Sequence, residues 1–266
     1  MRAEYSSYQQ IESIFSSTNL PKIAYLPVGC TEQHGPILPL GTDTLVAKQL
    51  AIDLCTYRKE KDAPGIIYPE IAYSPSRSNT NYPGSTTISE DAFRSYCNEV
   101  CCSILRHKFD ALVIICMHGP AEPSLIEIAF KLNQIQFERG ENVRPILVLG
   151  MLRLSKVFRK WFGTNTGKHA DFREFLLLYK AIGVDFFSPK VVAALEEFSS
   201  RYAKSTLSSI ELLGVPMELR SVEGVVGTPM PKSEKTHSEL AEGIWNDLII
   251  AFSEAVDRSL SDLQSL

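Results

Sequence analysis

Residues 26–43 hold two carboxylates and an imidazole at a spacing suited to metal binding. Glu32 and His34 are two positions apart, so in an extended chain their side chains point to the same side, and Asp43 follows a short way on. Glycines and prolines throughout the segment exclude a helix and favour a loop of fixed shape: Pro27, Gly29, Gly35, Pro36, Pro39 and Gly41. A surface loop with ordinary polar residues is an equally good interpretation of this pattern alone.

Three more candidate residues lie later in the chain. His118 directly follows residues 110–117, an apolar run typical of a parallel strand covered on both faces. Open α/β sheets bind ligands just past such strand ends, although a lone histidine there is often structural. His169 and Glu174 precede the apolar residues 175–179. Taken alone, Glu174 is typical of a solvated carboxylate on a helix.

The loop sequence resembles the opening motif of the creatininase (creatinine amidohydrolase) family. The matching residues are Leu26, Pro27, Gly29, Glu32, Gln33, His34, Gly35, Pro36, Leu38, Pro39, Thr42 and Asp43. Ile37 departs from the motif, because many members have a second histidine there. This long match favours the metal-site interpretation over a plain surface loop.

Residues 74–85 resemble a second family segment, with chemical changes. Ser76, Pro83 and Gly84 match, Tyr82 replaces a phenylalanine, and three residues depart: Ser74, Ser78 and Asn79. The resemblance implies that this loop borders the substrate, with Ser76 and Tyr82 in contact with it; a plain surface loop is the alternative. Trp161 is a further candidate substrate contact, or else a core residue.

His118 and Gly119 match a third family motif, although Cys116, Met117, Pro120 and Ala121 depart from it. His169, Ala170 and Glu174 match a fourth, from which Asp171, Phe175 and Leu176 depart. The resemblance implies two metal sites that share Asp43. One takes Glu32, Asp43 and His118, and the other takes His34, Asp43 and Glu174. It also implies that His169 assists catalysis without being an essential ligand.

These donors are all nitrogen or oxygen, which suits two divalent ions, zinc and/or manganese. A hydroxide bridging the metals would attack the substrate carbonyl, and His169 would protonate the leaving nitrogen. The expected function is a creatininase-like amidohydrolase acting on a non-peptide C–N bond in a cyclic amide or amidine. The alternatives are a formamide deformylase, a peptide-maturation hydrolase, or a non-catalytic metal-binding scaffold.

Alternating apolar runs and helical patterns must position these residues. Strands are expected at residues 22–26, 66–73, 110–117 and 144–151, and helices at 44–57, 89–108, 122–139, 152–162 and from 233 to about 260. This alternation predicts an α/β fold with a mostly parallel sheet and helices on both faces. The resemblance further implies a creatininase-like three-layer sandwich, and no linker divides residues 1–266, so one domain is expected.

The composition of the chain limits the kinds of partner that it is expected to bind. The chain has 266 residues, 44% of them hydrophobic, with a formal net charge of -4. No basic patch indicates nucleic acid, and no apolar run suits a membrane span or a signal peptide, so a cytoplasmic protein is expected. The expected partner is a small-molecule amide substrate. The resemblance implies a homo-oligomer, a hexamer.

Overall fold

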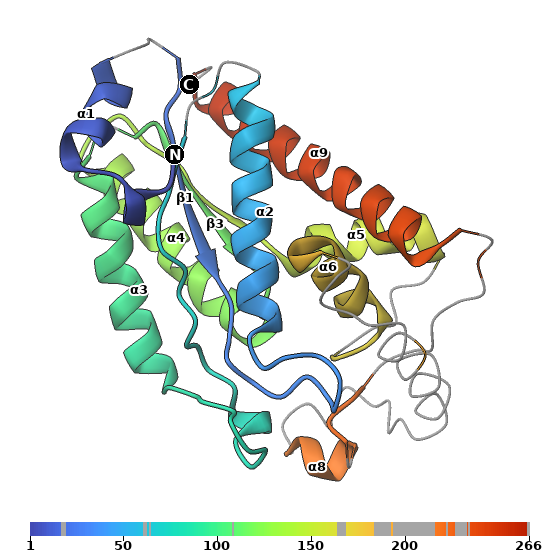
Figure 1. Cartoon of the computed structure of the whole chain (residues 1–266). Coiled ribbons are helices and arrows are strands. Elements are labelled where there is room, and N and C mark those ends of the chain that lie inside the picture. Colours follow the sequence, from blue (N-terminus) through green and yellow to red (C-terminus); the bar gives the residue numbers. More distant parts are fainter. Residues whose placement is uncertain are drawn as a thin grey trace.

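Four parallel strands lie at the centre of the computed structural model, within the residues it describes (Figure 1). Their spatial order is β2 (Gly65–Ile67), β1 (Ile23–Val28), β3 (Ala111–Cys116) and β4 (Ile146–Leu149). The structure describes residues 1–16, 20–60, 63, 65–107, 109–163, 169–183, 193, 216–221, 223–226, 233 and 235–264. The predicted parallel sheet is confirmed.

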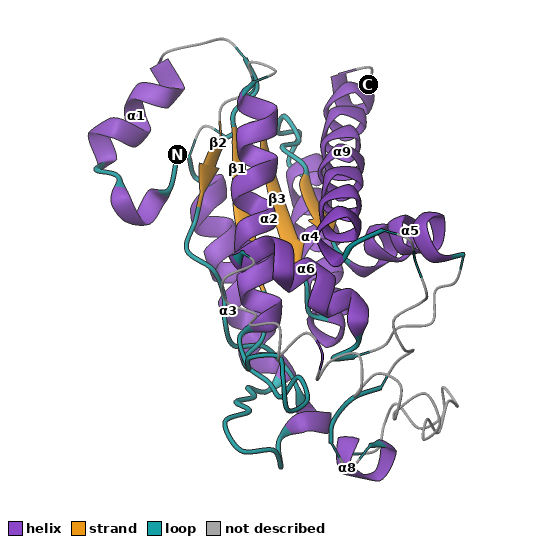
Figure 2. Cartoon of the chain, turned by 45° about the vertical axis from the view of Figure 1, so that its right-hand side comes forward, coloured by secondary structure: helices purple, strands orange, loops and turns teal. Residues whose placement is uncertain are grey.

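Helices cover both faces of the sheet (Figure 2). One face packs on α2 (Thr42–Lys59), α5 (Met151–Phe162), α6 (Phe172–Ile182) and α9 (His237–Gln264). The other packs on α3 (Glu90–Leu105) and α4 (Glu122–Glu138). The two-sided cover follows from β3, where Val113 and Ile115 join the first core and Leu112 and Ile114 join the second.

The remaining elements are short or lie at the N-terminus. They are η1 (Ala3–Tyr5), α1 (Tyr8–Ser16), η2 (Arg77–Asn79), η3 (Gly119–Ala121) and α8 (Met217–Arg220). The sequence patterns did not predict α1. It packs Ile11, Ile14 and Phe15 against the α3 and α4 core. Among the described residues, no helix is both long and apolar enough to cross a membrane.

Element boundaries differ from expectation by a few residues, as β2 and α2 illustrate. The strand predicted at 66–73 ends at Ile67, and Ile71 makes only an isolated bridge with Val28. Pairing with β1 loses its register after Ile67: the N–H of Tyr68 bonds to the carbonyl of Tyr25, but the carbonyl of Pro27 then accepts from Ile71 and not from Glu70, so one extra residue interrupts the strand. Helix α2 begins at Thr42 after Gly41, not at Thr44, and this places Asp43 in its first turn.

The chain leaves the central strands in opposite directions. The connection after β1 runs through α2 to β2, and the connection after β3 runs through α4 to β4 on the other side of the sheet. Val28 and Cys116 are direct partners in the register, so both strands end at the same edge. A crevice at such a reversal of strand order is where open α/β sheets bind ligands.

Candidate metal centre

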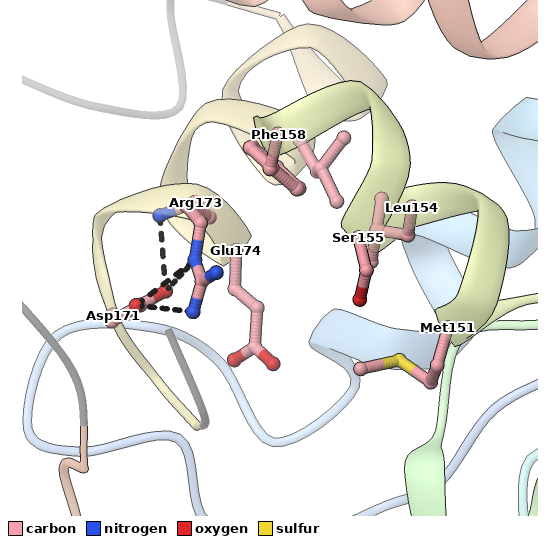
Figure 3. A pocket seen from close by; sticks show the side chains of 8 residues that line it. Met151, Leu154, Ser155, Phe158, Asp171, Arg173 and Glu174 are labelled. Atoms are coloured by element: carbon pink, nitrogen blue, oxygen red, sulfur yellow. Dashed lines mark hydrogen bonds and ion pairs between the residues drawn. The ribbon is translucent and has the colours of Figure 1, made fainter. Parts of the chain in front are cut away.

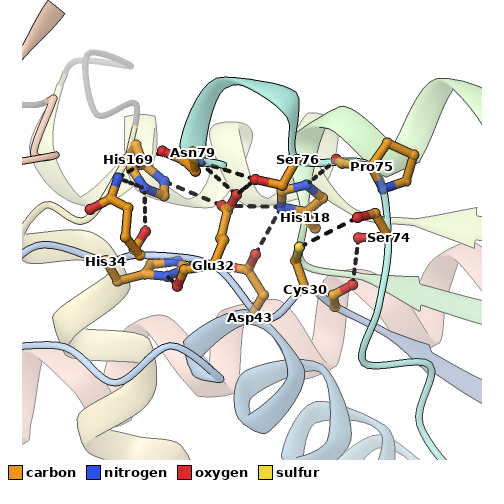
Figure 4. A network of polar contacts seen from close by, with 12 residues as sticks. Cys30, Glu32, His34, Asp43, Ser74, Pro75, Ser76, Asn79, His118 and His169 are labelled. Carbon is orange, nitrogen blue, oxygen red and sulfur yellow. Dashed lines mark hydrogen bonds and ion pairs between the residues drawn. The ribbon is translucent and has the colours of Figure 1, made fainter. Parts of the chain in front are cut away.

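All five predicted ligand side chains meet at this edge of the sheet. Figure 4 labels Glu32, His34, Asp43 and His118 there. Glu32 and His34 come from the loop after β1, Asp43 from α2, His118 from the residues after β3, and Glu174 from the first turn of α6. The first four are buried, while the side chain of Glu174 is 23% exposed. Segments far apart in the sequence thus supply one compact set of donors.

The ring of His118 is fixed at both nitrogens. Its Nε2 lies 2.9 Å from the carbonyl oxygen of Pro75 and donates its proton there. Its Nδ1 lies 2.9 Å from Asp43 Oδ2 and 3.3 Å from Glu32 Oε1. In the neutral imidazole, the Nδ1 lone pair would therefore face two carboxylate oxygens.

His34 repeats this arrangement on the other side of Asp43. Its Nδ1 donates to the backbone carbonyl of Glu32 at 3.0 Å. Its Nε2 lies 3.2 Å from Asp43 Oδ1 and 3.6 Å from Glu174 Oε2. In both His118 and His34, the lone pair of the inner ring nitrogen would point at carboxylate oxygens. The two repel each other unless a cation lies between them. The residues present therefore fit divalent metal ions, with the outer nitrogen of each ring held by a carbonyl as in known histidine ligands.

When no metal is bound, protons on the histidines must supply the positive charge that faces the carboxylates. Burial opposes charging His34, but Asp43 and Glu174 outweigh this and raise its pKa to about 10. Glu32 and Asp43 likewise outweigh burial and raise the pKa of His118 well above its usual value. The paired histidines lower the pKa of Glu32 and Asp43 despite burial. The metal-free cluster is thus a charged network at neutral pH.

Metal binding is expected to displace these protons. We predict that binding at pH 7 releases about two protons per chain and that metal affinity falls as pH is lowered. Because the folded pKa of His34 is raised, its charge stabilises the metal-free fold below pH ~6.5, and this contribution is lost as pH rises towards about 10. Calorimetry in buffers of different ionisation enthalpy measures the proton release. A binding enthalpy independent of the buffer would contradict the prediction.

Ser76 and Asn79 hold one oxygen of Glu32. The hydroxyl of Ser76 and Nδ2 of Asn79 both donate to Glu32 Oε2, the latter at 2.7 Å. Oε1 is left to face His118. Ser76 is a predicted substrate contact, and in the structure its hydroxyl hydrogen-bonds to the candidate metal ligand Glu32.

Removing these donors should loosen Glu32. We expect Asn79→Ala to weaken metal binding by about 10- to 100-fold, the usual effect of losing a group that orients a ligand. Metal competition with a chromogenic chelator measures this affinity. Asn246→Ala, on the exposed face of α9, is the matched control and should bind metal normally. Equal affinity in both variants would show that Asn79 does not orient Glu32.

His169 lies beside this cluster and is held by the chain around it. Its backbone pairs with Val226, and its Nε2 lies 2.8 Å from the carbonyl oxygen of Gln33. The amide nitrogen of Gln33 also lies 2.9 Å from Nε2, but its two N–H groups are donated to Asn79 and Gly224. Nε2 of His169 therefore carries the proton, and Nδ1 is left as the free nitrogen, 3.7 Å from Glu32 Oε1. Burial lowers the pKa of His169. A neutral imidazole therefore presents a proton-accepting nitrogen at the edge of the cluster.

Gln33 and Gly224 complete this support, and the sequence patterns gave neither a role. Gln33 Nε2 donates to Asn79 Oδ1 at 2.8 Å and to the carbonyl of Gly224 at 2.9 Å. Gly224 has a φ of 75°, and a Cβ there would collide with the Gln33 amide. In the sequence, the sign that Gln33 has a role was its place within the matched family motif.

The other two predicted substrate contacts are anchored on neighbouring segments. The hydroxyl of Tyr82 donates to the carbonyl of Ser221 at 2.8 Å. The indole of Trp161 donates to Asp247 of α9 at 2.6 Å, and the Lys235 ammonium lies 4.5 Å from the ring centroid. The structure does not bring Trp161 among the five ligands. The sequence of residues 162–168 also favours a loop that could lie over the pocket, and residues 164–168 of it are outside the described part of the chain.

Comparison with known proteins gives consistent results. The creatininase family model, described as creatinine amidohydrolase, matches residues 4–252. A crystal structure of creatinine amidohydrolase (creatininase) superposes with a TM-score of 0.73 at 16% identity, covering 97% of each chain. A structure named Creatininase Mn gives a TM-score of 0.71 at 16% identity, covering 97% of this chain and 98% of the other. The predicted fold is confirmed.

One relative found by sequence has a different name. The mycofactocin precursor peptide peptidase of Mycolicibacterium smegmatis is 38% identical over 68 residues. That match covers 25% of this chain and only 28% of the relative's length.

Proposed function

The chain belongs to the creatininase family, and we propose that it is a metal-dependent amidohydrolase that cleaves a C–N bond of a small amide. The observation that carries this proposal is the pair His34 and His118. Each ring is anchored at its outer nitrogen by a backbone carbonyl and faces carboxylates with its inner nitrogen. Such an arrangement serves a cation, and the donors are those that zinc and manganese accept.

Asp43 is the shared ligand in this proposal. Its Oδ1 faces His34 and its Oδ2 faces His118, so one carboxylate serves both halves of the centre. Glu32 would complete the site on the His118 side, and Glu174 would complete the site on the His34 side. Bound divalent ions would polarise the substrate carbonyl and make water acidic enough to ionise near neutral pH.

His169 would carry the proton. With Nε2 held by the Gln33 carbonyl, Nδ1 can accept a proton from the attacking water and pass it to the leaving nitrogen. Its lowered pKa favours the neutral form needed for the first step. Gln33 and the backbone pairing with Val226 keep the ring in place without touching the reacting atoms.

Two substrate classes fit this chemistry. A cyclic amide or amidine, such as creatinine, is the first candidate and rests on the family and the motifs. A bond in a short precursor peptide is the second, favoured by the name of the M. smegmatis relative. Changes at Ser74, Ser78 and Asn79, in the loop expected to border the substrate, weaken the inference of creatinine itself.

A substrate panel tests the proposal. The protein is loaded with zinc or manganese and assayed against creatinine, a formamide and short peptides, with Asp43→Ala as the inactive control. Turnover of one class identifies the reaction. Bound metal without turnover of any amide would favour the non-catalytic scaffold instead.

We also propose a homo-oligomer, a hexamer, on the strength of the family resemblance. Light scattering at micromolar concentration measures the mass directly. A monomer would contradict this part of the proposal.

A further inference from the structure

A small pocket adjoins the candidate metal centre between α5 and α6 (Figure 3). Its volume is about 30 Å³, enough for a small group the size of about two water molecules. Its walls include Met151, Ser155, Phe158, Arg173 and Glu174. Because Glu174 is also a candidate ligand, the pocket borders the candidate metal centre.

Arg173 is the cation of the pocket. The residue is only 8% exposed, and its guanidinium lies 5.4 Å from the centroid of the Phe158 ring. Its Nε and Nη2 donate to Asp171 Oδ2 at 3.1 and 3.0 Å. Asp171 in turn caps α6 by accepting from the backbone N–H of Arg173. Asp171 therefore fixes the orientation of the guanidinium and offsets the cost of burying its charge.

One side of this guanidinium is unused. Nη1 of Arg173 makes no hydrogen bond with any residue that the structure describes. The hydroxyl of Ser155, on another wall of the pocket, has none within that part of the chain either. Arg173 is largely buried and Ser155 is half-buried, so both donors are open to a group that enters the pocket. A small acceptor with negative charge would pair with both.

We infer that this pocket binds a carboxylate of the substrate. A carboxylate is planar and small, and it matches the fork of a guanidinium. The inference rests on the proposed function, which it makes more specific: the amide that is cleaved carries a free carboxylate near the scissile bond. Arg173 is then a determinant of specificity, beside the ligand Glu174 and outside the set that holds metal.

The test compares two probes that differ only in charge. N-acetylglycine carries a carboxylate, and N-acetylglycinamide is its neutral analogue. Their dissociation constants are measured by calorimetry on the zinc-loaded protein. We expect the acid to bind about 10- to 100-fold more tightly, from one charge-assisted hydrogen-bonded pair. Equal binding of the two probes by the wild-type protein would overturn the inference.

Variants separate the pocket from the metal, which also attracts carboxylates. Arg173→Met should abolish the preference for the acid while metal content stays unchanged. Arg159→Met, an exposed arginine on α5, should keep the preference. A preference that survives in Arg173→Met would place the carboxylate on the metal and overturn the inference. Arg173→Gln, which can still donate to Asp171, replaces the methionine variant if that one does not fold.

The binding test is independent of turnover. If no amide is hydrolysed but the Arg173-dependent preference persists, the proposed function fails and the carboxylate site stands. If amides are hydrolysed without regard to a carboxylate or to Arg173, the function stands and this inference fails.

Discussion

Asp43→Ala is expected to lose both metal ions and all hydrolysis. The two oxygens of Asp43 lie 3.2 Å from His34 Nε2 and 2.9 Å from His118 Nδ1, so its carboxylate faces both halves of the centre at once. Elemental analysis after reconstitution should fall from about two ions per chain to nearly none. The free energy of unfolding of the metal-free protein should also fall by about 3–5 kcal/mol, since two buried imidazoliums lose their partner.

Asp91→Ala is the matched control. Asp91 is the second residue of α3 as Asp43 is the second residue of α2, but it is exposed. It should bind metal and fold normally. Asp43→Asn keeps the shape of the side chain and separates loss of charge from loss of packing. Full metal content in either Asp43 variant would disprove the assignment of Asp43 as the shared ligand.

His169→Ala is expected to keep most of its metal and lose activity. His169 Nδ1 is the free nitrogen beside the cluster, and its loss removes the proton carrier, which typically costs about 10²- to 10⁴-fold in rate. Metal content and rate should be measured on the same preparation. His107→Ala, an exposed histidine after α3, is the control and should change neither quantity.

Glu174→Gln is expected to weaken metal binding, in contrast to His169→Ala. It removes a carboxylate that lies 3.6 Å from His34 Nε2, so one metal site should weaken. His169 is itself close enough to Glu32 and His34 to share an ion with them. Loss of metal in His169→Ala would therefore identify it as a ligand, and an unchanged rate would show that it only supports the loop.

Local sequence patterns predicted most of the framework. Apolar runs located all four strands, and the helix predicted from residue 89 begins there, where the hydroxyl of Ser89 caps α3 by accepting from the N–H of Ala92. The exceptions depend on contacts between segments that are far apart in the chain. The register between β2 and β1 shifts by one residue after Ile67, and α1 is stabilised by the contact of Phe15 with Phe109.

The sequence by itself determined the kinds of donor and their attachment to strand ends. Glu32, His34 and Asp43 lie close along the chain, so a loop between β1 and α2 had to bring them together. His118 had to follow β3, because the apolar run ends there. Recognition of the family from these motifs is confirmed by the family model that matches residues 4–252.

Only the tertiary structure decided which atoms face the centre. The tautomer of His118 depends on the carbonyl of Pro75, and the position of His169 depends on Gln33, 136 residues away in the chain. The pocket at Arg173 exists because α5 packs beside α6. Hydrogen bonds and cavities of this kind depend on the packing of separate elements, which no local pattern of residue types records.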